Sequence, residues 1–259
     1  MSSSFEKFRN LHSTADLLVL PNAWDAKSAM LLQEEKFPAV ATSSAAVAGS
    51  LGYGDGEEMP LSDYLFVISR ILASIKIPLS VDIEMGYGRS DDAISNNVQT
   101  LVDLGIAGIN IEDSTIEKSG RVLKDANLFA KTIENIKSRL ASKGDDLFVN
   151  IRCDTYILNV DHKKEETKRR LKLYEAAGAN GIFLPCIALD DDIAEAVSHT
   201  KLPLNVMCIP GLPGFERLRE LGVKRVSMGP FLFNTVYDNA GRLGRTIIAD
   251  RNFSSINHQ

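Results

Sequence analysis

The sequence predicts a (β/α)8 TIM barrel, and three observations support this fold class. Short β-rich apolar runs alternate strictly with helix-like segments, eight times along the chain. The length of 259 residues suits one barrel, so we expect a single domain over residues 1–259. Leu104-Gly105, Ala177-Gly178 and Leu221-Gly222 each end a helix just before a strand. The alternative is a doubly wound open sheet, but Pro21-Asn22-Ala23-Trp24 is not the glycine-rich loop which that fold needs.

The first half of the chain supplies four strands, bounded by turn residues. They are predicted at Leu17–Leu20, Ala39–Thr42, Ile77–Val81 and Gly108–Ile111. Helical segments are predicted over residues 5–12, up to about Glu35, from Ser62, over Asp91–Leu104 and over Ala126–Ala141. Ser90 is expected to cap the helix that follows it. Ser43–Pro60 and Ser114–Lys124 are predicted as loops.

The second half repeats the pattern. Four strands are predicted at Leu147–Ile151, Gly181–Leu184, Leu204–Met207 and Arg225–Met228. Helices are predicted at Lys163–Ala177, near Asp191–Ser198, over Gly214–Leu221 and from Phe231. Eight βα units account for nearly the whole chain, and no linker separates a second domain.

Composition excludes several classes of protein. The net charge of -5 argues against a nucleic-acid partner, which would need a basic face. No apolar run approaches the roughly 20 residues of a membrane span. The N-terminus lacks the apolar core of a secretory signal, and Cys153, Cys186 and Cys208 show no CxxC spacing. We therefore expect a cytoplasmic protein with free thiols.

The stretch Val81–Gly88 carries the clearest chemical signal. Asp82 and Glu84 follow an apolar run, and alternation along a strand would project both from one face. Buried carboxylates need a partner, and a hard cation such as Mg²⁺ is the natural one. A strand that frays into a solvated acidic turn is the alternative.

Polar side chains gather at the predicted carboxyl ends of the strands, where barrels place their chemistry. They are Asn22, Trp24, Asp25, Ser43, Ser44, Asp55, Glu57, Asp82, Glu84, Asn110, Glu112, Asp113, Asn150, Arg152, Asp154 and Asn205. Carboxylates crowded at one end of a barrel repel each other unless a cation lies among them. Arg152 suits a carboxylate or phosphoryl group of a substrate. No histidine falls at a strand end, which argues against acid-base catalysis by histidine and against a histidine-bound zinc.

Five motifs in order resemble the isocitrate lyase / phosphoenolpyruvate mutase superfamily over nearly the whole chain. They are Pro21-Asn22-Ala23-Trp24-Asp25-Ala26, Thr42-Ser43-Ser44 with Leu51–Glu57, Asp82–Gly88, Glu112-Asp113-Ser114, and Arg152-Cys153-Asp154. The resemblance implies a Mg²⁺- or Mn²⁺-dependent enzyme. It would cleave or rearrange a C–C or P–C bond of a small 2-oxo or 2-hydroxy acid through an enolpyruvate-like intermediate.

The resemblance also implies roles for individual residues. Asp82, Glu84 and Glu112 would hold the metal, and Asp55 would act as nucleophile or base. Ser43, Ser44 and Arg152 would bind the carboxylate or phosphonate substrate, with Trp24, Gly120 and Asn205 beside it. Family members often exchange the last helix between subunits, so we expect a homodimer or homotetramer in which Phe231–Tyr237 lies in the contact.

One motif departs from the family. Lyases of the family carry Lys-Lys-Cys-Gly-His or Lys-Arg-Cys-Gly-His after the fourth strand, with Cys as the proton donor. Here the loop reads Glu117-Lys118-Ser119-Gly120-Arg121. Ser119 is a far poorer acid than a thiol with a pKa of about 8.5. We expect Ser119 and Arg121 to close over the substrate on a mobile loop, Thr115–Lys124, and we leave lyase, mutase and hydrolase open. A non-catalytic carboxylate-binding or scaffold barrel and a purely structural oligomer are the other hypotheses.

Overall fold

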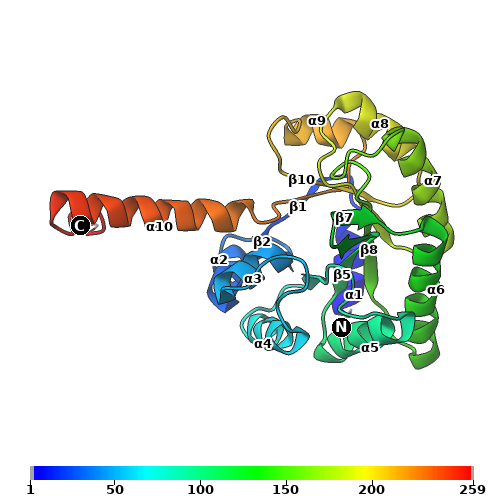
Figure 1. The fold of residues 1–259 in the computed structure, drawn as a ribbon, viewed down its shortest axis with the longest axis horizontal. Helices are drawn as coiled ribbons and strands as arrows, with labels where there is room; N and C mark the ends of the chain where they lie inside the picture. Colours follow the sequence, from blue (N-terminus) through cyan, green and yellow to red (C-terminus); the bar gives the residue numbers. More distant parts are fainter. Residues whose placement is uncertain (1–2, 258–259) are drawn as a thin grey trace.

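The computed structural model describes residues 3–257 and confirms the barrel (Figure 1). Within that range one sheet holds nine strand segments in the order β1-β11-β10-β9-β8-β5-β4-β3-β2, and every pairing in it is parallel. The segments are β1 (Leu18–Leu20), β2 (Asn22–Ala23), β3 (Val40–Thr42), β4 (Leu79–Asp82), β5 (Gly108–Glu112), β8 (Phe148–Arg152), β9 (Gly181–Phe183), β10 (Leu204–Met207) and β11 (Arg225–Ser227).

The sheet closes on itself through its first strand. β1 pairs with β11 and β2 pairs with β3, and only Pro21 separates β1 from β2. The Pro21 carbonyl still accepts a hydrogen bond from the Ala41 amide at 2.9 Å. The two segments therefore form one barrel strand, interrupted where proline has no N–H to donate.

Helices precede and follow the strands, and those that were predicted lie within a few residues of their expected positions. The helices are α1 (Ser4–Leu11), α2 (Ala26–Glu34), α3 (Ser44–Leu51), α4 (Leu61–Leu72), α5 (Asp91–Leu104), α6 (Ala126–Lys143), α7 (Lys163–Ala176), α8 (Asp190–Ser198), α9 (Phe215–Glu220) and α10 (Phe231–Asp250). Ser90 caps α5 as predicted, because its side chain accepts from the Ala93 amide. Gly105 ends α5 in the left-handed region at φ 93°, which a residue with a Cβ rarely adopts.

Two predicted loops contain regular structure. Ser43–Pro60 includes α3, which Ser43 caps through the Ala46 amide. Its sequence of small and apolar residues has no polar stripe, so helical periodicity could not reveal it. Ser114–Lys124 forms the antiparallel hairpin β6 (Ser114–Glu117) and β7 (Gly120–Leu123).

The core has two parts. Most buried side chains lie between the strands and the surrounding helices. A smaller cluster joins Phe5 and Phe8 of α1 to inward-facing strand residues such as Leu20 and Phe148. Phe8 meets Phe148 edge to face at 5.4 Å between ring centroids. Helix α1 therefore closes the amino-terminal end of the barrel and leaves the carboxyl-terminal end open for a site.

Helix α10 differs from the other helices. It extends away from the barrel, and none of its residues is buried (Figure 1). Its first turn packs on its own chain, where Phe233 meets Trp24 at 5.4 Å between ring centroids. Among the described residues, no helix is long and apolar enough to span a bilayer.

Candidate active site

A cavity of about 180 Å³ lies at the carboxyl-terminal ends of the strands. Five predicted site residues line it: Ser43, Ser44, Asp55, Asp82 and Arg152. Its other lining residues are Asn22, Ala45, Asn110, Ile157, Phe183, Pro185, Met207, Ser227, Gly229 and Pro230. The residues come from β2, β4, β5, β8, β9, β10 and β11, from the start of α3 and from loops next to the strands, so closure of the barrel brings them together.

Asp82 is the last residue of β4 and is held by the start of α3. The hydroxyl of Ser44 donates to Asp82 Oδ2 at 2.8 Å, and the Ser44 amide donates to the same oxygen at 3.3 Å. Tyr64 fixes the backbone by donating from its hydroxyl to the Asp82 carbonyl at 2.8 Å. Burial raises the pKa of the Asp82 carboxyl, while Arg152 and the bonds from Ser44 oppose that rise.

Glu84 takes a different environment from Asp82. The strand ends at Asp82, and Glu84 adopts a left-handed backbone with φ 50°, so the expected alternation along one strand was wrong. Glu84 accepts hydrogen bonds from the Glu57 amide at 2.9 Å and the Tyr87 hydroxyl at 3.2 Å. Burial, with repulsion from Asp82 and Asp55, raises the pKa of Glu84 to about 7. Glu84 does not line the cavity, but its carboxyl repels those of Asp82 and Asp55, which do.

Glu112 and Arg152 end the neighbouring strands β5 and β8, where they are register partners. Arg152 Nη1 lies 2.9 Å from Glu112 Oε2, and Arg152 Nε lies 2.6 Å from Asp154 Oδ1. Arg121 of β7 donates to the other oxygen of Glu112, Oε1. Glu112 is 1 % exposed. It lies between the guanidinium groups of Arg121 and Arg152 at the edge of the cavity.

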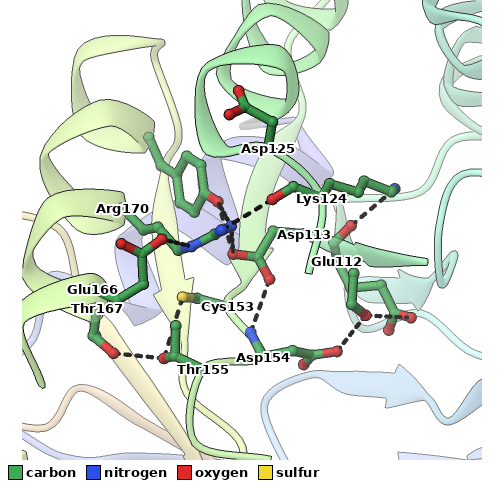
Figure 2. Close-up of polar contacts among 12 residues, drawn as sticks. Glu112, Asp113, Lys124, Asp125, Cys153, Asp154, Thr155, Glu166, Thr167 and Arg170 are labelled. Carbon is green, nitrogen blue, oxygen red and sulfur yellow. Dashed lines mark hydrogen bonds and ion pairs between the residues drawn. The ribbon is translucent and has the colours of Figure 1, made fainter. Parts of the chain in front are cut away.

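A second polar network lies behind this edge and is centred on Asp113 (Figure 2). Asp113 Oδ2 accepts from Arg170 Nη1 at 2.9 Å and from the Tyr174 hydroxyl at 2.7 Å. Asp113 Oδ1 accepts from the Asp154 amide at 2.8 Å. Arg170 also donates to the Lys124 carbonyl at 2.9 Å, at the base of the β6–β7 hairpin. Helix α7 therefore fixes both the strand ends and the end of the hairpin loop above them.

Ser119 and Gly120 lie at the turn of the hairpin, and both are exposed. Neither lines the cavity. The hairpin lies close to the loop that carries Asp55. A Cβ on Gly56 of that loop would meet Ile116 Cδ1 of β6. Only Arg121, among the predicted residues of this loop, reaches the edge of the cavity through Glu112.

Trp24 and Asn205 were predicted beside the substrate, and neither lines the cavity. Trp24 packs against Phe233 of α10, and Asn205 lies buried in the barrel interior, 1 % exposed. The cavity instead contacts Asn110 and Ser227, to which the sequence argument assigned no role. Asn110 stood in the list of strand-end residues, and its place two residues before Glu112 puts both on one face of β5.

The donor atoms at this site fit a hard divalent cation. Within residues 3–257 no three His, Cys, Asp or Glu side chains are already arranged as a metal-binding group. The cavity nevertheless offers carboxylate and hydroxyl oxygens, which Mg²⁺ prefers. Glu112 Oε2 is buried and accepts no hydrogen bond from the described residues, because the nearby Arg152 Nη1 is not aligned with it. The residues therefore suit a Mg²⁺ or Mn²⁺ ion bound through Asp82.

Comparisons with known proteins identify related sequences and structures. The family model for phosphoenolpyruvate phosphomutase matches residues 8–248. An uncharacterized protein of Mycobacterium tuberculosis strain H37Rv is 38% identical over 240 residues, which are 93% of this chain and 88% of the relative. Oxaloacetate decarboxylase 1 of Pseudomonas fluorescens is 28% identical over 225 residues, 84% of this chain and 75% of that enzyme. A solved phosphonomutase-like structure from Burkholderia cenocepacia J2315 is 30% identical with a TM-score of 0.88, covering 94% of this chain and 98% of that one.

Proposed function

The chain belongs to the phosphoenolpyruvate phosphomutase family, and we propose that it is a Mg²⁺- or Mn²⁺-dependent lyase of small 2-oxo or 2-hydroxy diacids. One observation carries the proposal: Asp82 and Arg152 line the same cavity. The cavity thereby offers a carboxylate to a hard cation and a guanidinium fork to a substrate carboxylate. Oxaloacetate is the first substrate to test, because an oxaloacetate decarboxylase is among the relatives.

The metal would be held by Asp82, with Glu84, Glu112 and Asp55 adding negative charge around it. When bound, the ion supplies Lewis-acid polarisation of the 2-oxo group and stabilises an enolate. The raised pKa values of Asp82 and Glu84 support this role, because buried acids that repel each other gain most from an added cation.

Arg152 and the start of α3 would bind the substrate carboxylates. Ser43 and Ala45 line the cavity at the amino-terminal end of that helix, where N–H groups and the helix dipole favour an anion. Arg152 is held by Asp154 and Glu112, so its planar fork is oriented before the substrate arrives. Binding at both carboxylates would orient the diacid and position one C–C bond for cleavage.

Asp55 is the candidate base. It lines the cavity and accepts no hydrogen bond from another residue in the described range 3–257. For oxaloacetate, the C3–C4 bond breaks, its electron pair moves to the enolate oxygen, and CO₂ leaves. A proton taken up from water at C3 then gives pyruvate. With a 2-hydroxy acid, Asp55 would instead take the hydroxyl proton as the C–C bond breaks.

A non-catalytic carboxylate-binding barrel remains the second candidate, and one observation favours it. Arg121 pairs with Glu112 and neutralises a carboxylate that the family resemblance places beside the metal. Such a protein would bind diacids without converting them. Turnover separates the two functions.

The test is a screen of the purified protein against oxaloacetate, methylisocitrate and phosphonopyruvate, with Mg²⁺, with Mn²⁺ and with EDTA. We expect metal-dependent release of pyruvate from oxaloacetate, above the rate of metal alone, which Asp82→Asn abolishes. Asp92→Asn, an exposed acid on α5, is the matched control and should retain activity. Diacid binding without turnover of any substrate would favour the non-catalytic barrel.

A further inference from the structure

The interior of the barrel below the cavity is unusually polar. Barrel strands ordinarily fill this space with branched aliphatic side chains. Here Asn110, Asn150, Asn205 and Arg225 occupy it, each at most 5 % exposed. Asn110 is the register partner of Asn150, and Asn205 is that of Arg225. Four polar side chains on four strands therefore face one another under the candidate active site.

Arg225 is a cation without a carboxylate partner in the described part of the chain. It is fully buried, and its Nε and Nη1 make no hydrogen bond there. Its Nη2 donates to Asn110 Oδ1 at 3.4 Å. Burial lowers the pKa of Arg225 to about 9, opposed by Asp82, so the side chain keeps its charge at neutral pH. A buried charge of this kind is costly to keep, which points to a role beyond packing.

These contacts decide which way the amide of Asn110 faces. Asn150 Nδ2 donates to Asn110 Oδ1 at 2.9 Å, and Arg225 donates to the same oxygen. A guanidinium has no acceptor, so only the oxygen of the amide can face it. The amide therefore cannot flip without placing two donors against each other.

The amide NH₂ group of Asn110, Nδ2, faces the cavity. Asn110 lines the cavity together with Asp82 and Arg152. Its Nδ2 donates to no residue in the described range and is not among the polar atoms sealed from solvent. The site thus presents an amide donor whose orientation is fixed from below by Arg225 and Asn150.

We propose that Asn110 binds a carboxylate oxygen of the substrate through Nδ2, and that Arg225 is the positioning residue that orients this amide. The proposal rests on the proposed function and adds a specificity determinant to it. An amide donor and a cation beneath it favour a substrate with a second anionic oxygen at the floor of the cavity. Monocarboxylates lack that group and bind less tightly.

Asn110→Asp separates this role from a structural one. An aspartate keeps the shape and the oxygen that faces Asn150 and Arg225, and it gives the buried guanidinium a charged partner. Its second oxygen replaces the donor in the cavity with a negative charge. We expect an unchanged or higher melting temperature together with a loss of oxalate binding, measured by titration calorimetry with Mg²⁺ present.

Asn110→Ala removes the donor without adding charge. We expect KM for oxaloacetate to rise about tenfold or more, as for one lost hydrogen bond to a charged group, with kcat changed less than about threefold because the contact is equal in ground and transition states. Ser80→Ala is the control, since Ser80 is equally buried, its hydroxyl is unpartnered among the described residues, and it does not line the cavity. Arg225→Met should raise KM in the wild-type background but not in Asn110→Ala, because both act through one amide.

The outcomes separate the two proposals. Wild-type protein that neither binds oxalate nor converts oxaloacetate would refute the proposed function and this inference together. Wild-type protein that binds oxalate, with Asn110→Asp and Asn110→Ala binding it equally well, would refute the inference alone.

Discussion

Arg121 Nη1 donates a hydrogen bond to Glu112 Oε1, so the β6–β7 hairpin is tied to the end of a barrel strand beside the cavity. The same nitrogen donates to Ser114 Oγ at 2.9 Å and lies 3.7 Å from Asp154 Oδ2. Arg121 lies on β7 and joins this strand of the hairpin to the site. The hairpin is therefore suited to open and close through the contacts of one side chain, Arg121.

The first prediction concerns this hairpin as a lid. Arg121→Gln should accelerate hydrogen exchange at Thr115–Leu123 by about tenfold, since it removes one charge-assisted hydrogen bond. Oxalate with Mg²⁺ should slow that exchange in the wild-type protein. Lys118→Gln, at the exposed turn, is the control and should exchange like wild type. Exchange that neither the variant nor the ligand alters would count against a lid.

The second prediction concerns the metal. Mg²⁺ or Mn²⁺ at a hundredfold excess over Kd should stabilise the native state by about 2.7 kcal/mol, because only the folded site binds it. Differential scanning fluorimetry should therefore show a higher melting temperature with metal. Asp82→Asn should abolish the rise, and Asp92→Asn should retain it. An equal rise in Asp82→Asn would remove Asp82 from the metal site.

The third prediction concerns assembly through α10. Val236, Tyr237 and Ile248 on this helix are 44 %, 52 % and 79 % exposed, an apolar surface unusual on a monomer. We propose that α10 packs on a second copy of the chain, which gives a dimer or tetramer. Light scattering at micromolar concentration should report that mass, and Tyr237→Asp with Ile248→Asp should lower it. Asp238→Asn is the control, and a monomeric wild-type protein would contradict the exchange.

The fourth prediction compares Ser119 with Asp55. Ser119 is exposed at the hairpin turn, whereas Asp55 lines the cavity. Ser119→Cys should leave the native turnover nearly unchanged, while Asp55→Asn should lower kcat on a 2-hydroxy acid by about 10²–10⁴, as expected for loss of a general base. Both variants are measured on the same substrate panel. A strong gain of methylisocitrate cleavage in Ser119→Cys would show instead that only a proton donor had been lost.

The fifth prediction concerns acid stability at the closed end of the barrel. Burial, with repulsion from Arg225, lowers the pKa of His12 from 6.5 to about 3. Between these two pKa values His12 is protonated in the unfolded chain and neutral in the native state. The stability of the native state therefore falls as pH drops from 6.5 toward 3. Between pH 7 and pH 4.5 the loss from this group is about 2–3 kcal/mol. Urea unfolding of His12→Gln should show a smaller loss over that range, and an identical pH dependence would contradict this account.

Local sequence patterns were sufficient for the barrel and for part of the site. Alternating apolar runs and helix-ending glycines such as Gly105 predicted the strands and helices, because these signals depend on neighbours a few residues apart. Position at a strand end predicted that Ser44, Asp82 and Arg152 would share one cavity, since parallel strands end at one rim.

Only the tertiary structure decided how those groups pair. Arg225 reaches Asn110 across 115 positions of sequence and Arg170 reaches Asp113 across 57, and no local pattern specifies either partner. The left-handed turn at Glu84 and the small-residue helix α3 were missed for a related reason. Their conformations are selected by burial against distant strands, where packing and charge compensation outweigh the preferences of the local chain.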